Sequence, residues 1–268
     1  IKSMTSDLKY LGIKTIYFGG GEPFLHNNLI EIIDFAKKLQ IIPSISTNGS
    51  LINKKILSKL YGVGFKHNLY ISLDGPNESI NDLIRGKGSF KKTIASIDKL
   101  SQYKKIQFAL TMVLTKININ YIDDMILLAK NKGARFLNLN KIAINDGRAK
   151  DFKEILNLDQ EIFLRKIEEL KKKFKCHGEF FGECYAFSLN KNDPAIFINN
   201  TKNNIQKKIP LGISIGYDGK VQFTPMKIVI GNYNESGSIK KIVEDAMNDK
   251  DIEKNIKNWL SKNKDLLN

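Results

Sequence analysis

Hydrophobic and polar positions along the chain switch repeatedly between two periods. Short apolar runs typical of buried strands occupy residues 15–18, 43–46, 69–73, 107–114 and 136–140. Between and after them, apolar residues recur every three to four positions, which predicts helices near residues 28–39, 53–60, 90–100, 122–132 and 159–174. Regular alternation of strands and helices predicts right-handed βαβ units and a parallel sheet, open or closed into a barrel.

The pattern changes after about residue 175. Residues 213–223 read as a β-hairpin with Asp218-Gly219 as its turn, and two further helices are predicted near residues 239–247 and 252–260. We therefore predict two domains: residues 1–175 form the α/β part, and residues 176–268 form a small α+β appendage.

Composition limits the classes of function. The 268 residues include 42% hydrophobic ones, and no apolar run approaches the roughly 20 residues of a membrane span. We expect a cytoplasmic protein with no membrane partner. The net charge of +15 is compatible with nucleic acid, but the lysines are scattered, and a compositional bias of the source genome explains them equally well. The charge is therefore weak evidence for a nucleic-acid partner, and we expect none.

A glycine-rich loop follows the first predicted strand. Its sequence is Gly19-Gly20-Gly21-Glu22-Pro23. Glycine allows close approach of the main chain to a ligand, and outward-facing carbonyls beside Glu22 suit an ammonium group better than a phosphate. No Gly-Lys-Ser/Thr follows, which separates this loop from the usual phosphate-binding loops.

The next two strands also end in polar groups. Thr47 and Asn48 follow the second strand; Ser72 and Asp74 share one face at the end of the third, and Arg85 stands in the loop after it. Carbonyls, an arginine and hydroxyl or amide groups together match an ammonium, a carboxylate and sugar hydroxyls. This set suits a nucleoside that carries an amino acid.

These motifs, in this order, resemble those of radical S-adenosylmethionine enzymes. The run Gly147-Arg148-Ala149 is similar to a further segment of that superfamily. The most similar branch carries a C-terminal auxiliary domain of the SPASM/twitch type and includes maturases of peptides and sulfatases. The resemblance covers residues 5–150 strongly, and extends weakly over Cys184-Tyr185-Ala186 and the hairpin.

The resemblance implies a partial (β/α)6 TIM-like barrel with S-adenosylmethionine at the carboxyl ends of its strands. Asp74 is then expected to brace its loop, and Arg148 is either a second cofactor contact or a structural ion pair. The expected cofactor contacts are Gly20, Gly21 and Glu22 at the ammonium, Thr47 and Asn48 near the sugar, Ser72 and Arg85 at the ribose and carboxylate, and Ile142 or Ala143 at the adenine.

The family also requires a [4Fe–4S] cluster, usually held by three closely spaced cysteines. This chain has only Cys176 and Cys184, which are either ligands for an auxiliary cluster or plain thiols. We expect the first strand and cluster loop to lie upstream of Ile1; the competing hypothesis is a protein without the cluster.

The resemblance thus implies an enzyme that generates a 5′-deoxyadenosyl radical to abstract hydrogen from a peptide or protein side chain. Its implied partners are a substrate peptide, with or without a leader, and an electron donor such as flavodoxin or ferredoxin. The alternatives are a non-catalytic module that binds a nucleoside or leader peptide, and an RNA-modifying enzyme.

Overall fold

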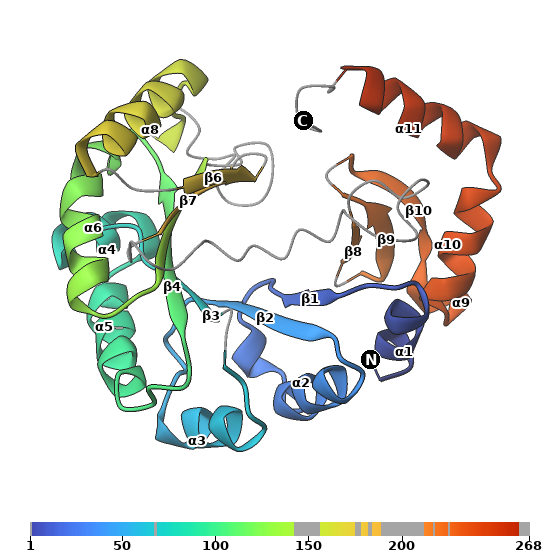
Figure 1. Cartoon of the computed structure of the whole chain (residues 1–268), viewed down its shortest axis with the longest axis horizontal. Helices are drawn as coiled ribbons and strands as arrows, with labels where there is room; N and C mark the ends of the chain where they lie inside the picture. Colours follow the sequence, from blue (N-terminus) through green and yellow to red (C-terminus); the bar gives the residue numbers. More distant parts are fainter. Residues whose placement is uncertain are drawn as a thin grey trace. The chain divides into compact units, whose positions relative to one another are not determined.

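The computed structural model describes residues 2–66, 69–141, 156–174, 178–181, 184–188, 212–216, 218–224 and 226–262. Strands and helices alternate along the first half of the chain (Figure 1). The elements up to residue 141 are α1 (Lys2–Tyr10), β1 (Thr15–Phe18), η1 (Pro23–Leu25), α2 (Leu29–Lys38), β2 (Ile42–Thr47), α3 (Lys54–Gly62), β3 (Leu69–Ser72), α4 (Glu78–Arg85), α5 (Ser89–Leu100), β4 (Phe108–Leu114), η2 (Ile119–Tyr121), α6 (Ile122–Asn131) and β5 (Phe136–Lys141).

The later elements are shorter strands and three further helices. They are α8 (Gln160–Phe174), β6 (Gly178–Phe181), β7 (Cys184–Ser188), β8 (Ile213–Ile215), β9 (Lys220–Phe223), β10 (Ile228–Asn232), α9 (Tyr233–Ser236), α10 (Ile239–Met247) and α11 (Lys250–Lys262). Among the helices of the described residues, none is both long and apolar enough to cross a bilayer.

The main sheet has seven strands in the order β1-β2-β3-β4-β5-β7-β6. Neighbouring strands from β2 to β5 are parallel, and β7 pairs antiparallel with both β5 and β6. The five predicted strands of the α/β part are confirmed, each end within one residue. This is the predicted α/β architecture of a partial TIM-like barrel, extended by the two antiparallel strands, which the sequence analysis missed.

Alternation along the strands separates two faces of this sheet. On one face lie Ile71, Leu110 and Leu137, which are fully buried, and Figure 1 shows α5 and α6 running along this part of the sheet. The opposite face, which we call the inner face, carries Ser72, Thr111 and Asn138. It is therefore more polar than the helix-covered face.

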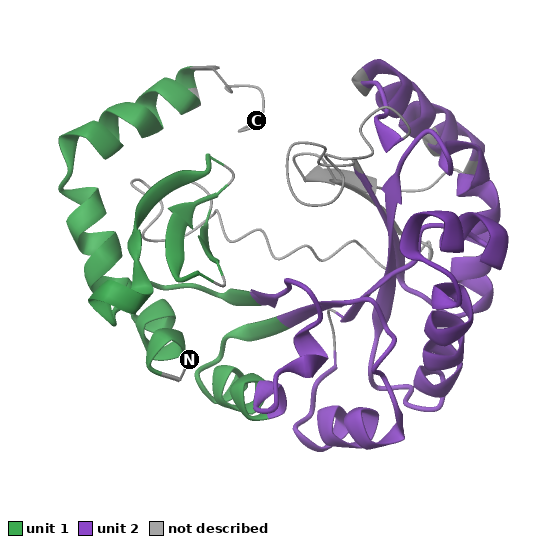
Figure 2. Cartoon of the chain, turned by 180° about the vertical axis from the view of Figure 1, so that it is seen from behind, with its two compact units in different colours: residues 1–16, 31–43, 198–268 green, residues 17–30, 44–197 purple. Residues whose placement is uncertain are grey.

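The chain packs into two compact units (Figure 2). Unit 1 comprises residues 1–16, 31–43 and 198–268, and unit 2 comprises residues 17–30 and 44–197. Because both units draw on several parts of the chain, this division follows packing rather than sequence order, and the domain boundary after residue 175 stays a prediction.

Unit 1 contains a three-stranded antiparallel sheet in the order β10-β9-β8. The predicted hairpin is confirmed as β8 and β9, with Gly219 at φ 81° in its turn, whereas the pattern did not predict β10. Leu11, just after α1, packs with Val221 of β9 and Ile242 of α10 in one apolar cluster. The two ends of the chain therefore share a core.

Candidate functional site

The Glu22 carboxylate joins the first two strand-end loops of unit 2. It caps η1 by accepting a hydrogen bond from the Phe24 amide at 3.2 Å. It also accepts the Thr47 hydroxyl at 2.8 Å and the Asn48 amide at 2.9 Å. Since the carboxylate has bonds on both oxygens, it fixes the glycine loop against the end of β2.

The glycines before Glu22 leave their backbone open. Gly20 has φ 107°, a conformation that L side chains rarely adopt, and a Cβ at Gly20 or Gly21 would meet no atom within 4 Å. A ligand can therefore approach this main chain directly. This geometry fits the predicted ammonium site.

The Thr47 hydroxyl forms its hydrogen bonds within the protein. The side chain is buried, and its hydroxyl donates to Glu22 and accepts from the Gly49 amide at 3.0 Å. The neighbouring Asn48 is half-buried and anchored at its carbonyl by the Thr93 hydroxyl of α5 at 3.0 Å. Thr47 is thus suited to hold Asn48 and Glu22 in place rather than to contact a ligand.

Asp74 braces the third strand-end loop, as expected. Its carboxylate accepts the Val113 amide at 2.7 Å and lies 2.8 Å from the Arg85 Nε in an ion pair, with the Asp74 side chain only 4% exposed. Burial raises the pKa of Asp74, while the charge of Arg85 and the Val113 N–H oppose the rise. The pair orients Arg85 at the end of β3.

Arg85 does not lie in a loop, and that prediction was wrong. It is the last residue of α4, an element that the apolar pattern did not show, and Gly86 at φ 93° ends the helix. The side chain is 24% exposed. Ser72, half-buried on the inner face, has a hydroxyl that forms no hydrogen bond with any other described residue. Both side chains therefore keep some surface available to a ligand.

A third carboxylate, Asp82, organises the turn between α4 and α5. It accepts hydrogen bonds from the Phe90 amide at 2.8 Å, the Ser89 hydroxyl at 2.9 Å and the Gly88 amide. These donors, the Phe90 N–H foremost, lower the pKa of Asp82 to about 2. The sequence analysis did not single out Asp82. The signal that could have found it is its position six to eight residues before Gly88-Ser89-Phe90, where the next helix begins.

Several predicted site residues cannot be compared with the structure. Ile142, Ala143, Arg148 and Cys176 lie outside the described residues. Cys184 belongs to β7, where its backbone stands opposite Asn140 of β5. The described residues contain no group of three or more His, Cys, Asp or Glu side chains that could hold a metal ion.

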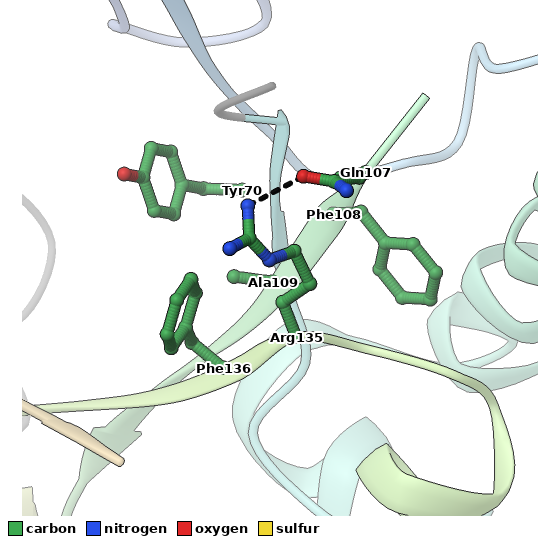
Figure 3. A pocket seen from close by; sticks show the side chains of 6 residues that line it. All are labelled: Tyr70, Gln107, Phe108, Ala109, Arg135 and Phe136. Atoms are coloured by element: carbon green, nitrogen blue, oxygen red, sulfur yellow. Dashed lines mark hydrogen bonds between the residues drawn. The ribbon is translucent and has the colours of Figure 1, made fainter. Parts of the chain in front are cut away.

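A small hollow lies at the other end of the strands. Its volume is about 230 Å³ including the open mouth. It lies where β3, β4 and β5 begin, whereas the loops described above follow the ends of β1, β2 and β3, so the hollow is separate from the candidate site. Figure 3 shows the Arg135 guanidinium bonded to Gln107 there. The lining residues are Tyr70, Gln107, Phe108, Ala109, Arg135 and Phe136.

Residues 1–129 match the family model described as "Radical SAM superfamily". The match covers just under half of the chain, and these residues are similar to that superfamily. The matched residues contain all three strand-end loops and Arg85, so the similarity lies in the same residues as the site geometry.

Two curated relatives are similar over about half of the chain. Mycofactocin maturase MftC of Mycolicibacterium smegmatis is 31% identical over 133 residues, which is 50% of this chain and 34% of that protein. The antilisterial bacteriocin subtilosin biosynthesis protein AlbA of Bacillus subtilis is 34% identical over 141 residues, 52% of this chain and 31% of that protein. The alignments thus span about a third of the length of these relatives.

Solved structures support the fold. Native anSMEcpe with bound AdoMet superposes with a TM-score of 0.59 and 18% identity, over 91% of this chain and 70% of that one. The same enzyme with bound AdoMet and the Kp18Cys peptide gives a TM-score of 0.51 and 21% identity, over 64% of this chain and 50% of that one. At these identities the comparison establishes the shared fold alone.

The two cofactors of the superfamily, S-adenosylmethionine and a [4Fe–4S] cluster, differ in how well these residues fit them. The open backbone at Gly20 and Gly21, the Ser72 hydroxyl and the Arg85 cation fit the nucleoside. The cluster does not fit, because the sequence has two cysteines where the family uses three in one loop. We therefore assign no cluster ligand in this chain.

Proposed function

We propose that this chain carries the S-adenosylmethionine site of a radical enzyme that modifies a peptide or protein side chain. The observation that carries the proposal is the Glu22 network. Two of its hydrogen bonds tie the glycine loop to the end of β2, a third caps η1, and the adjoining glycine backbone is left in open space.

Each part of the site has a role in this proposal. The Gly20 and Gly21 main chain would accept the ammonium group, and Ser72 would contact the ribose. Arg85 would contact the carboxylate, and Asn48 would line the sugar, held there by Thr47. Asp74 would set the position of Arg85 through their ion pair, and Asp82 would hold the turn that follows α4. We also keep Ile142 as the proposed adenine contact.

The bound nucleoside would supply radical hydrogen abstraction from an unactivated carbon. The residues of this chain bind and orient it, and the hydrogen bonds of Glu22, Asp74 and Asp82 keep the loops from rearranging. Preorganised contacts of this kind reduce the entropy that must be lost when reacting groups meet.

The names of the relatives support a peptide as substrate. One is a maturase, another serves the biosynthesis of a bacteriocin, and anSMEcpe has been crystallised with a peptide. We propose the same substrate class for this chain, together with a leader segment and a flavodoxin- or ferredoxin-type electron donor. An acidic donor would suit the net charge of +15.

Calorimetric titration of S-adenosylmethionine into the protein that contains this chain tests the proposal. We expect saturable binding, and we expect Ser72→Ala to weaken it about 3- to 10-fold, which corresponds to one hydrogen bond. Ser101→Ala removes a hydroxyl that is exposed and bonded only to its own helix end, so it should leave the affinity unchanged.

The outcomes separate the alternatives. No heat with the unaltered protein would overturn the proposal. Binding without 5′-deoxyadenosine after reconstitution of the cluster and reduction would instead favour the non-catalytic module.

A further inference from the structure

The inner face of β5 carries two asparagines with unpaired buried atoms. Asn138 and Asn140 stand two residues apart and so point to the same face of the sheet. Asn138 is only 6% exposed. The Oδ1 atoms of both side chains are buried and have no hydrogen-bond partner among the described residues.

Such unpaired atoms need an explanation, because a buried polar atom without a partner costs stability. The Asn138 Nδ2 lies 3.4 Å from the Thr111 hydroxyl. Turning the amide over would pair Oδ1 with that hydroxyl and leave Nδ2 unpaired. In either orientation, one atom of the Asn138 amide faces the inner side of the sheet without a partner.

Strand register places these amides beside the proposed cofactor site. Ser72 of β3 is opposite Thr111 of β4, and Thr111 is opposite Asn138 of β5. The three side chains form one row across the inner face, with about 4.8 Å between neighbouring strands. Asn138 is therefore about two strand spacings, roughly 10 Å, from the proposed ribose contact.

We propose that Asn138 and Asn140 bind the main chain of an extended peptide substrate along the inner face of β5. The two amides are separated by about 6.6 Å, the repeat of two strand residues. An extended peptide presents its N–H groups on one side at the same repeat, so with Asn138 Nδ2 bonded to Thr111, two N–H groups can pair with the two free Oδ1 atoms together. This inference rests on the proposed function, for which it specifies the substrate conformation.

The experiment uses peptides selected by display from a random decapeptide pool on the intact protein with S-adenosylmethionine present. Affinities of the enriched peptides are then measured by fluorescence anisotropy. We expect Asn138→Leu, which is similar in volume but cannot accept a hydrogen bond, to weaken peptide binding at least 10-fold. The affinity for S-adenosylmethionine should change less than 2-fold, which also checks that the variant is folded.

Two controls test whether binding depends on the contact between the Asn138 amide and the peptide main chain. Asn131→Leu makes the same chemical change at the exposed end of α6 and should leave peptide binding unchanged. N-methylation of the enriched peptide at two alternate residues should abolish binding to the unaltered protein, and the same modification should add little in Asn138→Leu.

Three results would overturn the inference. The first is that no peptide is enriched although S-adenosylmethionine binds, and the second is that the enriched peptides bind Asn138→Leu with unchanged affinity. The third is that N-methylation has no effect at any position, which would leave buried water as the partner of the two amides. Failure of S-adenosylmethionine binding would instead count against the proposed function.

Discussion

At the scale of single residues, three carboxylates around the candidate site fix backbone groups. Glu22 accepts a main-chain N–H from the loop after β2, Asp74 accepts one from β4, and Asp82 accepts one from the turn before α5. A carboxylate can accept several donors at once, which explains why single acidic residues can hold these turns. The candidate ligand contacts are then left to glycine backbone, hydroxyl and guanidinium groups.

The depressed pKa of Asp82 predicts a particular dependence of stability on pH. Because its pKa falls from 3.8 to about 2 on folding, ionised Asp82 stabilises the fold above pH 3.8, and this contribution is lost as the pH falls towards 2. Asp82→Asn should therefore lower the urea midpoint at pH 5 and 7. The difference from the unaltered protein should shrink between pH 4 and 2.

Asp124→Asn provides the matched control for this prediction. Asp124 is exposed in the first turn of α6, so its substitution should give nearly parallel profiles over the same range. A difference between Asp82→Asn and the unaltered protein that stays constant from pH 5 to 2 would contradict the assignment.

At the scale of elements, α4 shows how close packing positions a site residue. A Cβ at Gly75 would lie 2.6 Å from the Asn81 backbone nitrogen and 2.9 Å from the Ile80 Cβ. Only glycine therefore lets the loop after β3 pass this close to α4. The buried Asn81 completes the contact, since its Oδ1 accepts the Asp74 amide at 2.9 Å.

Gly75→Ala should therefore destabilise the protein by about 2 kcal/mol, within the range found when extra atoms are forced into packed sites. It should also weaken S-adenosylmethionine binding by displacing α4. Gly62→Ala, at the end of α3 where a Cβ meets nothing within 4 Å, should leave stability unchanged or raise it by up to about 1 kcal/mol. Urea unfolding of both variants measures the contrast, and equal effects would contradict it.

At the scale of the whole molecule, unit 1 depends on contacts between the two ends of the chain. Leu11 packs against Val221 and Ile239, and the Asp7 carboxylate accepts hydrogen bonds from the Ser238 hydroxyl at 2.8 Å and the Lys240 amide at 3.2 Å. The N-terminal segment thus caps the start of α10 and also packs against the buried apolar side chains of that helix. We infer that these segments unfold together.

Leu11→Ala tests this coupling. Loss of a buried leucine side chain should destabilise the protein by about 2–5 kcal/mol. It should also increase hydrogen exchange at β9 and α10, more than 200 positions away in sequence. Leu127→Ala removes a side chain that is 54% exposed on α6 and should change neither quantity measurably. Unchanged exchange at β9 in Leu11→Ala would show that the two segments open independently.

The sequence by itself determined the elements that local pattern specifies. Apolar runs and helical periodicity sufficed for β1 to β5, α5 and α10, because these segments bury one face whatever their neighbours are. The polar strand ends also followed from sequence, since parallel strands bring their carboxyl ends to one edge. The Asp218-Gly219 turn likewise carries its own local signal.

Only the tertiary structure decided which polar groups are bonded within the protein and which stay available. Thr47 and Ser72 look equivalent in sequence, yet Thr47 is paired with Glu22, whereas the hydroxyl of Ser72 has no bond to another described residue. The partners of Asp82 and the row from Ser72 to Asn138 depend on strand register and on contacts between separate elements. Pairing across space leaves no local periodicity, so no pattern along the chain could specify it.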